Sequence, residues 1–241
     1  MTTLARITIT LILAILFSSC GFDINIGNGK KGNGIVTEDH RAVNADFTSI
    51  SASEGLDVYV TQGNDFDIMV EADDNVIDLI GTDIKNGNLR IHAIENIGRA
   101  TKKVYVTLPV ITTLETSSGA GLITKNTIRA QNIDLSASSG SRLEIMDLKA
   151  EKVTVDSSSG ADIKMVGDTK ALYGNASSGS GIKADNLTAA TCEASASSGA
   201  GITVNVSESL IAKASSGGNI RYTGNAIVEN KKSSSGSVSA L

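Results

Sequence analysis

The chain has 241 residues, a net charge of −5, and 3% aromatic residues with no tryptophan. This length suits one large domain or two small ones. The charges are scattered and form no basic stripe, which argues against a nucleic-acid partner. The scarcity of flat rings argues against aromatic platforms for sugars or bases.

Residues 1–19 are predicted to be a lipoprotein signal peptide. Arg6 gives a positive n-region, and residues 7–17 form an apolar run of 11 residues, too short to span a bilayer. The run ends in FSSC, which resembles a bacterial lipobox, where cleavage before Cys20 frees a thiol that carries diacylglycerol. Phe17 departs from the usual leucine, and an ordinary secretory signal is the alternative. A lipidated Cys20 predicts an outer-membrane anchor, with the periplasmic and surface sides both open.

Residues 20–34 are rich in glycine and asparagine and are expected to be a flexible tether after the lipidated Cys20. If Cys20 is lipidated, Cys192 is the one free thiol of the mature chain. Its place in the alternating pattern points inward, so we interpret it as a small core residue.

Residues 35–112 are predicted to be a β-rich section without the repeat described below. Asn86-Gly87 predicts a two-residue hairpin turn. Residues 73–80 are predicted as a short helix capped by Asp73 or Asp74, or as another strand. SASEG at 51–55 is similar to the later SASSG, so these residues are candidates for the opening of the same column. The expected strands are 35–43, 47–51, 56–61, 67–72, 89–93 and 103–108.

Residues 113–241 carry a repeat, because Ser-Ser-Gly recurs at intervals of 18 to 21 residues. Apolar residues alternate on both sides of each copy, which predicts two strands joined by a glycine corner. About 20 residues cannot bury an apolar face alone, but stacked rungs can. We therefore predict an all-β fold, a parallel β-helix, with positive φ at each corner glycine. These glycines are Gly119, Gly140, Gly160, Gly179, Gly199, Gly217 and Gly236.

The two serines of each copy are expected to point to opposite sides of the column. The first serines would form an outward ladder, which could match a regular lattice. The favoured interpretation is that these small hydroxyls bond to the neighbouring rung and to the backbone. The ladder consists of Ser117, Ser138, Ser158, Ser177, Ser197, Ser215 and Ser234.

No residue set predicts catalysis, a metal or a cofactor. His40 and His92 have no partner at ligand spacing, and His92 is expected at a surface or an edge. Asp73, Asp74 and Asn75 lack EF-hand spacing, so a helix cap is the simpler interpretation. Glycan-active β-helices gather acidic residues on one face, whereas the carboxylates here are predicted to be dispersed: Asp134, Asp156, Asp162, Asp168 and Asp185.

The chain resembles the head GIN domain family of auto-transporter adhesins. The resemblance rests on FTSISASEGLDVYVTQG, KNGNLRIHA, KKVYVTLP and LETSSGAGLI, followed by the Ser-Ser-Gly rungs, and covers residues 34–228. It implies an exported β-helical lipoprotein and brings no catalytic residues.

Three functions are open at this point. The favoured one is a non-enzymatic envelope lipoprotein that binds an unknown protein or matrix partner. The second is a polysaccharide-active enzyme, which would need an acid pair in a cleft. The third is a structural element that self-associates through the ends of the column.

Overall fold

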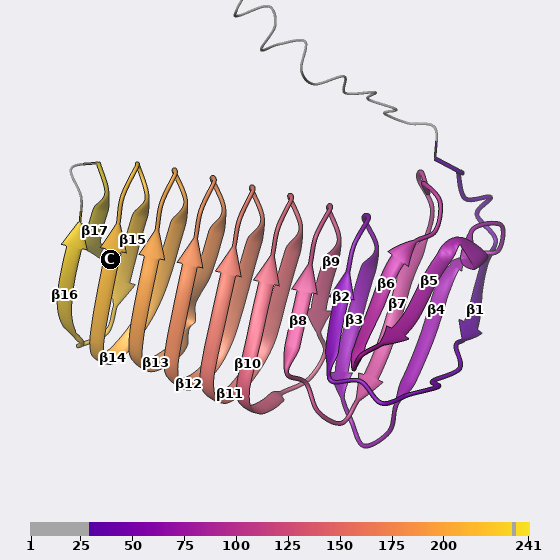
Figure 1. Ribbon diagram of the computed structural model, residues 1–241, viewed down its shortest axis with the longest axis horizontal. Helices are drawn as coiled ribbons and strands as arrows, with labels where there is room; N and C mark the ends of the chain where they lie inside the picture. Colours follow the sequence, from indigo (N-terminus) through magenta and orange to yellow (C-terminus); the bar gives the residue numbers. More distant parts are fainter. Residues whose placement is uncertain (1–28, 233–234) are drawn as a thin grey trace, which may run out of the picture.

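The computed structural model describes residues 29–232 and 235–241, whose strands form one continuous sheet coiled into a column (Figure 1). The predicted signal peptide, Cys20 and the first part of the expected tether lie outside these residues. In chain order the elements are β1 (Val36–His40), β2 (Ser49–Ala52), β3 (Asp57–Gln62), β4 (Asp67–Asp73), the 3-10 helix η1 (Ile77–Leu79), β5 (Ile80–Lys85), β6 (Asn88–Ala93), β7 (Lys102–Leu108), β8 (Thr113–Thr116), β9 (Gly121–Thr124), β10 (Ile128–Ala137), β11 (Arg142–Ser157), β12 (Asp162–Ala176), β13 (Gly181–Ala196), β14 (Gly201–Ala214), β15 (Asn219–Thr223), β16 (Ile227–Lys232) and β17 (Ser237–Ala240).

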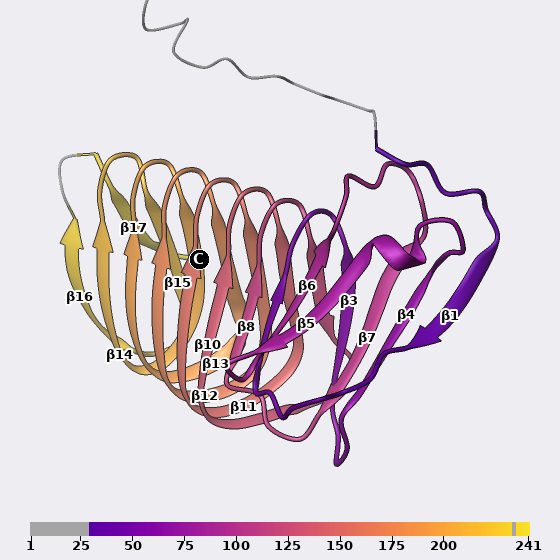
Figure 2. The same ribbon diagram turned by 45° about the vertical axis from the view of Figure 1, so that its right-hand side comes forward.

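The column has two walls that meet at the row of corners. Strand segments that run into the corners form the first wall, and segments that leave them form the second wall. Each of the long strands β11 to β14 begins in the second wall, bends on the side opposite the corners, and ends in the first wall (Figure 2). Neighbouring rungs pair in parallel along both walls, as in Leu135 with Val155 and Leu143 with Ile163. The predicted parallel β-helix is therefore confirmed.

Alternate side chains of both walls fill a single apolar core. Val153 and Val155 of the first wall and Ile163 and Met165 of the second are almost completely buried. Near the corners the buried side chains become small, because the two walls converge there. Buried hydroxyls at these positions are hydrogen-bonded, as in Ser180, whose Oγ donates to the Ser157 carbonyl at 2.8 Å. The buried hydroxyl of this residue near a corner is thus paired, as burial requires.

The corners are turns in which two consecutive residues have positive φ. In the corner at Gly160, Ser159 has φ 52° and Gly160 has φ 72°, and Ala161 N–H donates to Ser158 C=O at 3.1 Å. Two positive φ values are the pattern of a type I′ turn. The positive φ predicted for the glycine is confirmed at six corners, but the second serine does not point inward. It is an exposed turn residue, because the turn interrupts the alternation of the strand.

Gly236 departs from the other six corner glycines. Its φ is not in the positive range, and an added Cβ would lie 2.2 Å from the Ala214 carbonyl oxygen. Gly218, the residue after the preceding corner glycine, has the same kind of contact, at 2.3 Å from the Ala196 carbonyl oxygen. Ser237 pairs with Asn219. Gly236 therefore occupies the position after a corner, and the interpretation of this residue as a seventh corner glycine was wrong by one residue.

Differences in repeat length are absorbed away from the corners, in the bend between the walls. The pairings shift register there, between Ile145 and Leu148 of β11 and between Lys164 and Val166 of β12. Gly167 lies in this bend with φ 129°, and a Cβ on it would meet the Leu148 carbonyl oxygen at 2.1 Å. Bulges therefore let copies of 18 to 21 residues keep their corners aligned.

The N-terminal section supplies both the first rung and a cap. β2 and β3 pair in parallel with β8 and β9, and Glu54-Gly55 has the same positive φ pair as the later corners. The hairpin predicted at Asn86-Gly87 is confirmed and joins β5 to β6 in antiparallel pairing. β6 then extends the first wall, while β7, β4 and β1 extend the second. β5 comes directly after η1, and the sequence analysis did not predict a strand there.

Asp73 holds the incoming chain against this cap and does not cap a helix. Its buried carboxylate accepts hydrogen bonds from Gly34 N–H and Thr101 N–H, each at 2.6 Å. Asn75 Nδ2 donates to the Lys31 carbonyl oxygen at 2.8 Å. The helix there is only η1, which has no side-chain cap. Residues 29–34 of the expected tether therefore lie hydrogen-bonded along the head.

The corner geometry leads to a stability prediction for two glycines of one rung. Gly160→Ala should lower the free energy of unfolding by about 1–2 kcal/mol, because its only cost is a side chain at positive φ. Gly167→Ala adds steric overlap with backbone of the neighbouring rung, so its loss should be clearly larger. Urea unfolding measures both. An equal or larger loss for Gly160→Ala would contradict the assignment of an open corner.

Candidate functional site

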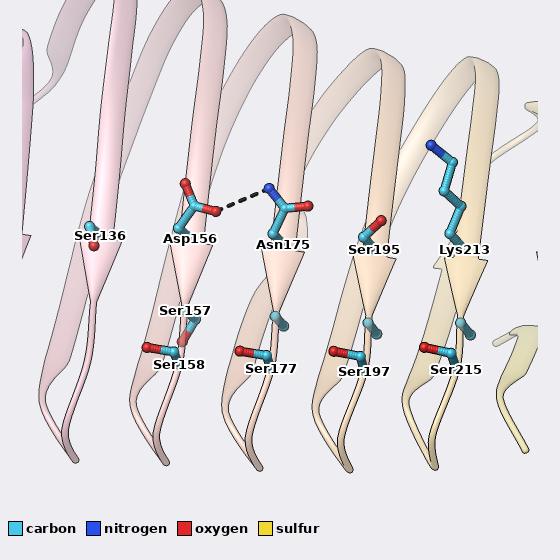
Figure 3. Close-up of a pocket in the computed structure, with 13 residues that line it drawn as sticks. Ser136, Asp156, Ser157, Ser158, Asn175, Ser177, Ser195, Ser197, Lys213 and Ser215 are labelled. Atoms are coloured by element: carbon cyan, nitrogen blue, oxygen red, sulfur yellow. Dashed lines mark hydrogen bonds between the residues drawn. The ribbon is translucent and has the colours of Figure 1, made fainter.

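The first wall carries a polar groove beside the corners, formed by two rows of outward side chains (Figure 3). We call it the serine groove. One row contains the first serine of each copy, and the other contains the residue two positions earlier. The two rows are Ser158, Ser177, Ser197 and Ser215, and Ser136, Asp156, Asn175, Ser195 and Lys213. Adjacent strands of a sheet are about 4.8 Å apart, so the serine row repeats a hydroxyl group at that interval.

The hydroxyls of the first serines have no hydrogen-bond partner among residues 29–232 and 235–241. The backbone N–H groups of these serines do form hydrogen bonds with the neighbouring rung. Ser177 N–H, for example, donates to Ser157 C=O at 3.0 Å. The interpretation that these hydroxyls bond to the neighbouring rung and to the backbone was therefore wrong. The serine side chains are half-buried and keep their donor and acceptor capacity for solvent or a partner. These serines are Ser117, Ser138, Ser158, Ser177, Ser197 and Ser215; Ser234 lies outside the described residues.

The groove continues to the capped end of the column. There it is lined by Ser51, Arg90, Glu115 and Ser117, and Ser136 belongs to both parts. Ser51 Oγ donates to Glu115 Oε2 at 3.0 Å, and Asn175 Nδ2 donates to Asp156 Oδ1 at 3.0 Å. The second row of the groove is visible in the sequence, because the residue two positions before the first serine is polar in every copy of the repeat. Its role as a groove wall emerges only when the rungs are stacked.

Charges on the outer face of the second wall pair across neighbouring rungs. Lys183 Nζ lies 3.4 Å from Asp162 Oδ1. Lys164 is exposed, as is Arg221. Acidic and basic residues both occur on this face, which is typical of a solvated surface.

The carboxylates considered for glycan chemistry do not gather on one strand position. Each of three of them pairs with a residue that is not acidic on the next strand: Asp134 with Thr154, Asp156 with Asn175, and Asp162 with Gly181. Among the described residues, no group of three His, Cys, Asp or Glu side chains could hold a metal ion.

The two histidines lie apart, on different strands of the cap. His40 is exposed, and its Nδ1 lies 3.2 Å from Asp67 Oδ1. His92 was expected at a surface or an edge, but its side chain is only 12% exposed and packs on Gly81. A Cβ on Gly81 would lie 2.4 Å from the His92 ring. The ring takes the space that this glycine leaves.

Cys192 lies in the core of the first wall, as its place in the pattern predicted. It is 5% exposed, and burial raises the pKa of its thiol to about 12. A thiol is nucleophilic only as the thiolate, so Cys192 contributes packing and not chemistry.

Two tyrosines stack on the outer face near the cap. Tyr59 of β3 and Tyr105 of β7 have ring centroids 5.1 Å apart and planes inclined by 20°. Both belong to a Val-Tyr-Val sequence, and the parallel pairing of their strands places them side by side. Tyr105 Oη donates to Glu71 Oε2 at 3.0 Å, and Lys103 Nζ donates to Glu71 Oε1 at 2.7 Å. The low aromatic content therefore did not prevent a local aromatic surface.

The column, its cap and its open polar faces define a β-solenoid head. Residues 46–226 match the family described as "Putative auto-transporter adhesin, head GIN domain". This match covers most of the chain, so the chain belongs to the head GIN domain family. The resemblance stated from the sequence is confirmed. No curated protein matches the chain.

Solved structures show the same fold at low sequence identity. A "putative adhesin" from Bacteroides fragilis has 22% identity and a TM-score of 0.79, covering 88% of this chain and 100% of that one. A "putative lipid binding protein" from Parabacteroides distasonis has 16% identity and a TM-score of 0.70, covering 88% and 98%. A "putative adhesin" from Parabacteroides merdae has 17% identity, a TM-score of 0.70 and the same coverage.

The family relation indicates a protein of the cell envelope or surface. Within the described part of the chain, no helix has the length and apolar character needed to cross a membrane.

The Glu71 cluster leads to a prediction of pH-dependent stability. The hydrogen bond from Lys103 lowers the pKa of Glu71 below its ordinary value of 4.5. The folded state therefore gains stability from Glu71 above pH 4.5 and loses it as the pH falls through the lowered pKa. Glu71→Gln should be less stable than the wild type at pH 7, and the difference should shrink at pH 3. Thermal unfolding at both pH values measures this, with the exposed Glu208→Gln as the control. A constant difference would contradict the role of the charge.

Proposed function

We propose that this chain is a non-enzymatic, lipid-anchored adhesin head of the bacterial envelope that binds its partner along the serine groove. The observation that carries this proposal is the row of unpaired serine hydroxyls, repeated on successive rungs. These hydroxyls are accessible and have no partner within the described residues, so a ligand can replace solvent on several successive rungs. The adhesin description of the family supports the same role.

The groove favours a long partner held by many weak contacts. Each neutral hydrogen bond contributes only about 0.5–1.5 kcal/mol, so one rung alone binds weakly. Repetition makes later contacts intramolecular once the first has formed, which raises the total affinity. The groove lining carries nearly as many basic as acidic residues, Arg90 and Lys213 against Glu54, Glu115 and Asp156. The groove therefore suits a partner of low net charge.

The anchor in this proposal is the diacylglycerol on Cys20, at the outer membrane. The glycines at 29 and 32 support a defined exit of the chain from the head, because a Cβ at Gly29 would lie 2.5 Å from Gly98 N. A head docked at its capped end would project the rest of the column away from the membrane.

Cys20→Ala tests the anchor in cells. The wild-type protein should fractionate with membranes and take up labelled palmitate, because acylation supplies the membrane affinity. The variant should lose the label and leave the membrane fraction. Membrane retention of unlabelled Cys20→Ala would contradict lipid anchoring at this residue.

Replacing three groove serines tests the binding face. Retention of the purified protein on fixed bacterial cells and on matrix-coated wells should fall by about tenfold or more in the variant Ser158→Ala, Ser177→Ala, Ser197→Ala. The matched control changes the exposed turn serines instead, as Ser159→Gly, Ser178→Gly, Ser198→Gly. Wild-type retention by the first variant would contradict the groove, and hydrolysis of envelope polysaccharide by the wild type would contradict a non-enzymatic head.

A further inference from the structure

A second hollow lies on the opposite side of the corners, in the second wall. It has a volume of about 260 Å³ and is lined by Asp57 and Tyr59 of β3, Gly121 and Ile123 of β9, and Arg142 of β11. Two corner glycines, Gly119 and Gly140, form its rim. We call it the Gly121 notch. It shares no residue with the serine groove.

The notch exists because a glycine separates two charged residues in one row of the sheet. Asp57 pairs with Gly121, and Gly121 pairs with Arg142, on three adjacent strands. The backbones of Asp57 and Arg142 are thus two strand spacings apart, about 10 Å. A Cβ on Gly121 would come within 3.3 Å of Asp57 Oδ1. Any side chain at this position would therefore fill the space between the two charges.

Both charges retain hydrogen-bonding capacity toward the notch. Asp57 has no hydrogen bond or ion pair within the described residues. Arg142 has only a long contact, 3.9 Å from Nε to Glu144 Oε1, and its side chain is 67% exposed. Asp162 lies in the same row beside another glycine, Gly181, but it is paired with Lys183 at 3.4 Å. The open charges at the notch are therefore a local feature and not a general property of the wall.

The third side of the notch is an aromatic ring held in place. Tyr59 stacks on Tyr105, whose hydroxyl is fixed by Glu71. Lys125 Nζ lies 5.3 Å from the centre of the Tyr59 ring, but Lys125 does not line the notch. A ring supported in this way loses little conformational freedom when a ligand packs on it.

We propose that the Gly121 notch binds one uncharged sugar unit of a glycan. A sugar ring has an apolar C–H face and a rim of hydroxyl groups. Tyr59 and Ile123 would contact the apolar face. The Asp57 carboxylate accepts hydrogen bonds from hydroxyls, and the Arg142 guanidinium donates to their oxygens. The two opposite charges cancel within the notch, so neither sign of net charge on a ligand is favoured overall.

This inference deepens the proposed adhesin role by naming a ligand class, and it rests on that role only in treating the head as a binding module. The notch is a different surface from the groove. The low aromatic content argued against an aromatic platform for sugars. Two of the four tyrosines nevertheless stack on each other beside the notch.

The test is titration calorimetry of the full-length protein with cellotetraose, maltotetraose and tetra-N-acetylchitotetraose. At least one should bind, with an affinity that changes less than twofold between 50 and 500 mM salt, because an uncharged ligand has no ion pairs to screen. Asp57→Asn, Gly121→Val and Tyr59→Ala should each weaken binding about tenfold or more, while Tyr59→Phe should retain it. Asp162→Asn and Gly201→Ala are matched controls on the same wall and should bind as the wild type. Thermal unfolding establishes that each variant is folded.

Three results would overturn the proposal. The first is failure of all three sugars to bind, or binding only of trigalacturonate, an acidic probe added to the panel. The second is wild-type affinity in folded Asp57→Asn and Gly121→Val. The third is an equal loss in the two control variants. The variant with three groove serines replaced should keep its sugar affinity, so its loss of cell retention would test the groove separately from the notch.

Discussion

The structure depends on the backbone hydrogen bonds that join each corner to the next. Gly140 N–H donates to Ser159 C=O at 3.0 Å, and the same bond recurs from corner to corner. The bond forms only if every corner turns in the same way, which fixes two positive φ values per rung. Glycine accepts this conformation readily, whereas serine does so at a cost of about 1–2 kcal/mol. Stacking offsets that cost, so the corners persist as a column.

Aligned corners force the remaining residues of each rung into equivalent places. Inward positions meet inward positions on the neighbouring rung and form the continuous apolar core. Outward positions form rows, so a residue type that recurs at one position of the repeat is presented many times along one face. Serine at one position thus forms a ladder of hydroxyls. A glycine between an aspartate and an arginine leaves a notch between the two charged side chains. The faces of the column are therefore the places where this fold can acquire a binding role.

The cap solves the problem that a first rung leaves a strand edge unpaired. β4 and β1 turn antiparallel on the second wall, and β5 does so beside the first wall. At the other end, within the described residues, β16 pairs only with β14 and β17 only with β15. The incoming chain is bound to the cap by the Asp73 carboxylate, so the two ends of the column differ in chemistry as well as in pairing.

The repeat, the strands of the rungs and the core could be predicted from the sequence alone. Period-two alternation and Ser-Ser-Gly spacing are local properties, and similar copies must stack if their apolar faces are to be buried. The sequence also determined the family, and it placed Cys192 in the core correctly. It did not reveal the shifted place of Gly236, because the shift depends on which residue of the preceding rung pairs with Ser237.

Which outward residues become neighbours depends on how the rungs pair in the folded chain. Asp57 and Arg142 are far apart in the chain, and Tyr59 meets Tyr105 only because β3 and β7 pair in register. The role of Asp73 was likewise settled by long-range contacts, since its partners Gly34 and Thr101 lie on separate segments. The physical reason is that a repeat specifies the rung, whereas a binding surface is made of neighbours on different rungs, and those neighbours are set by register.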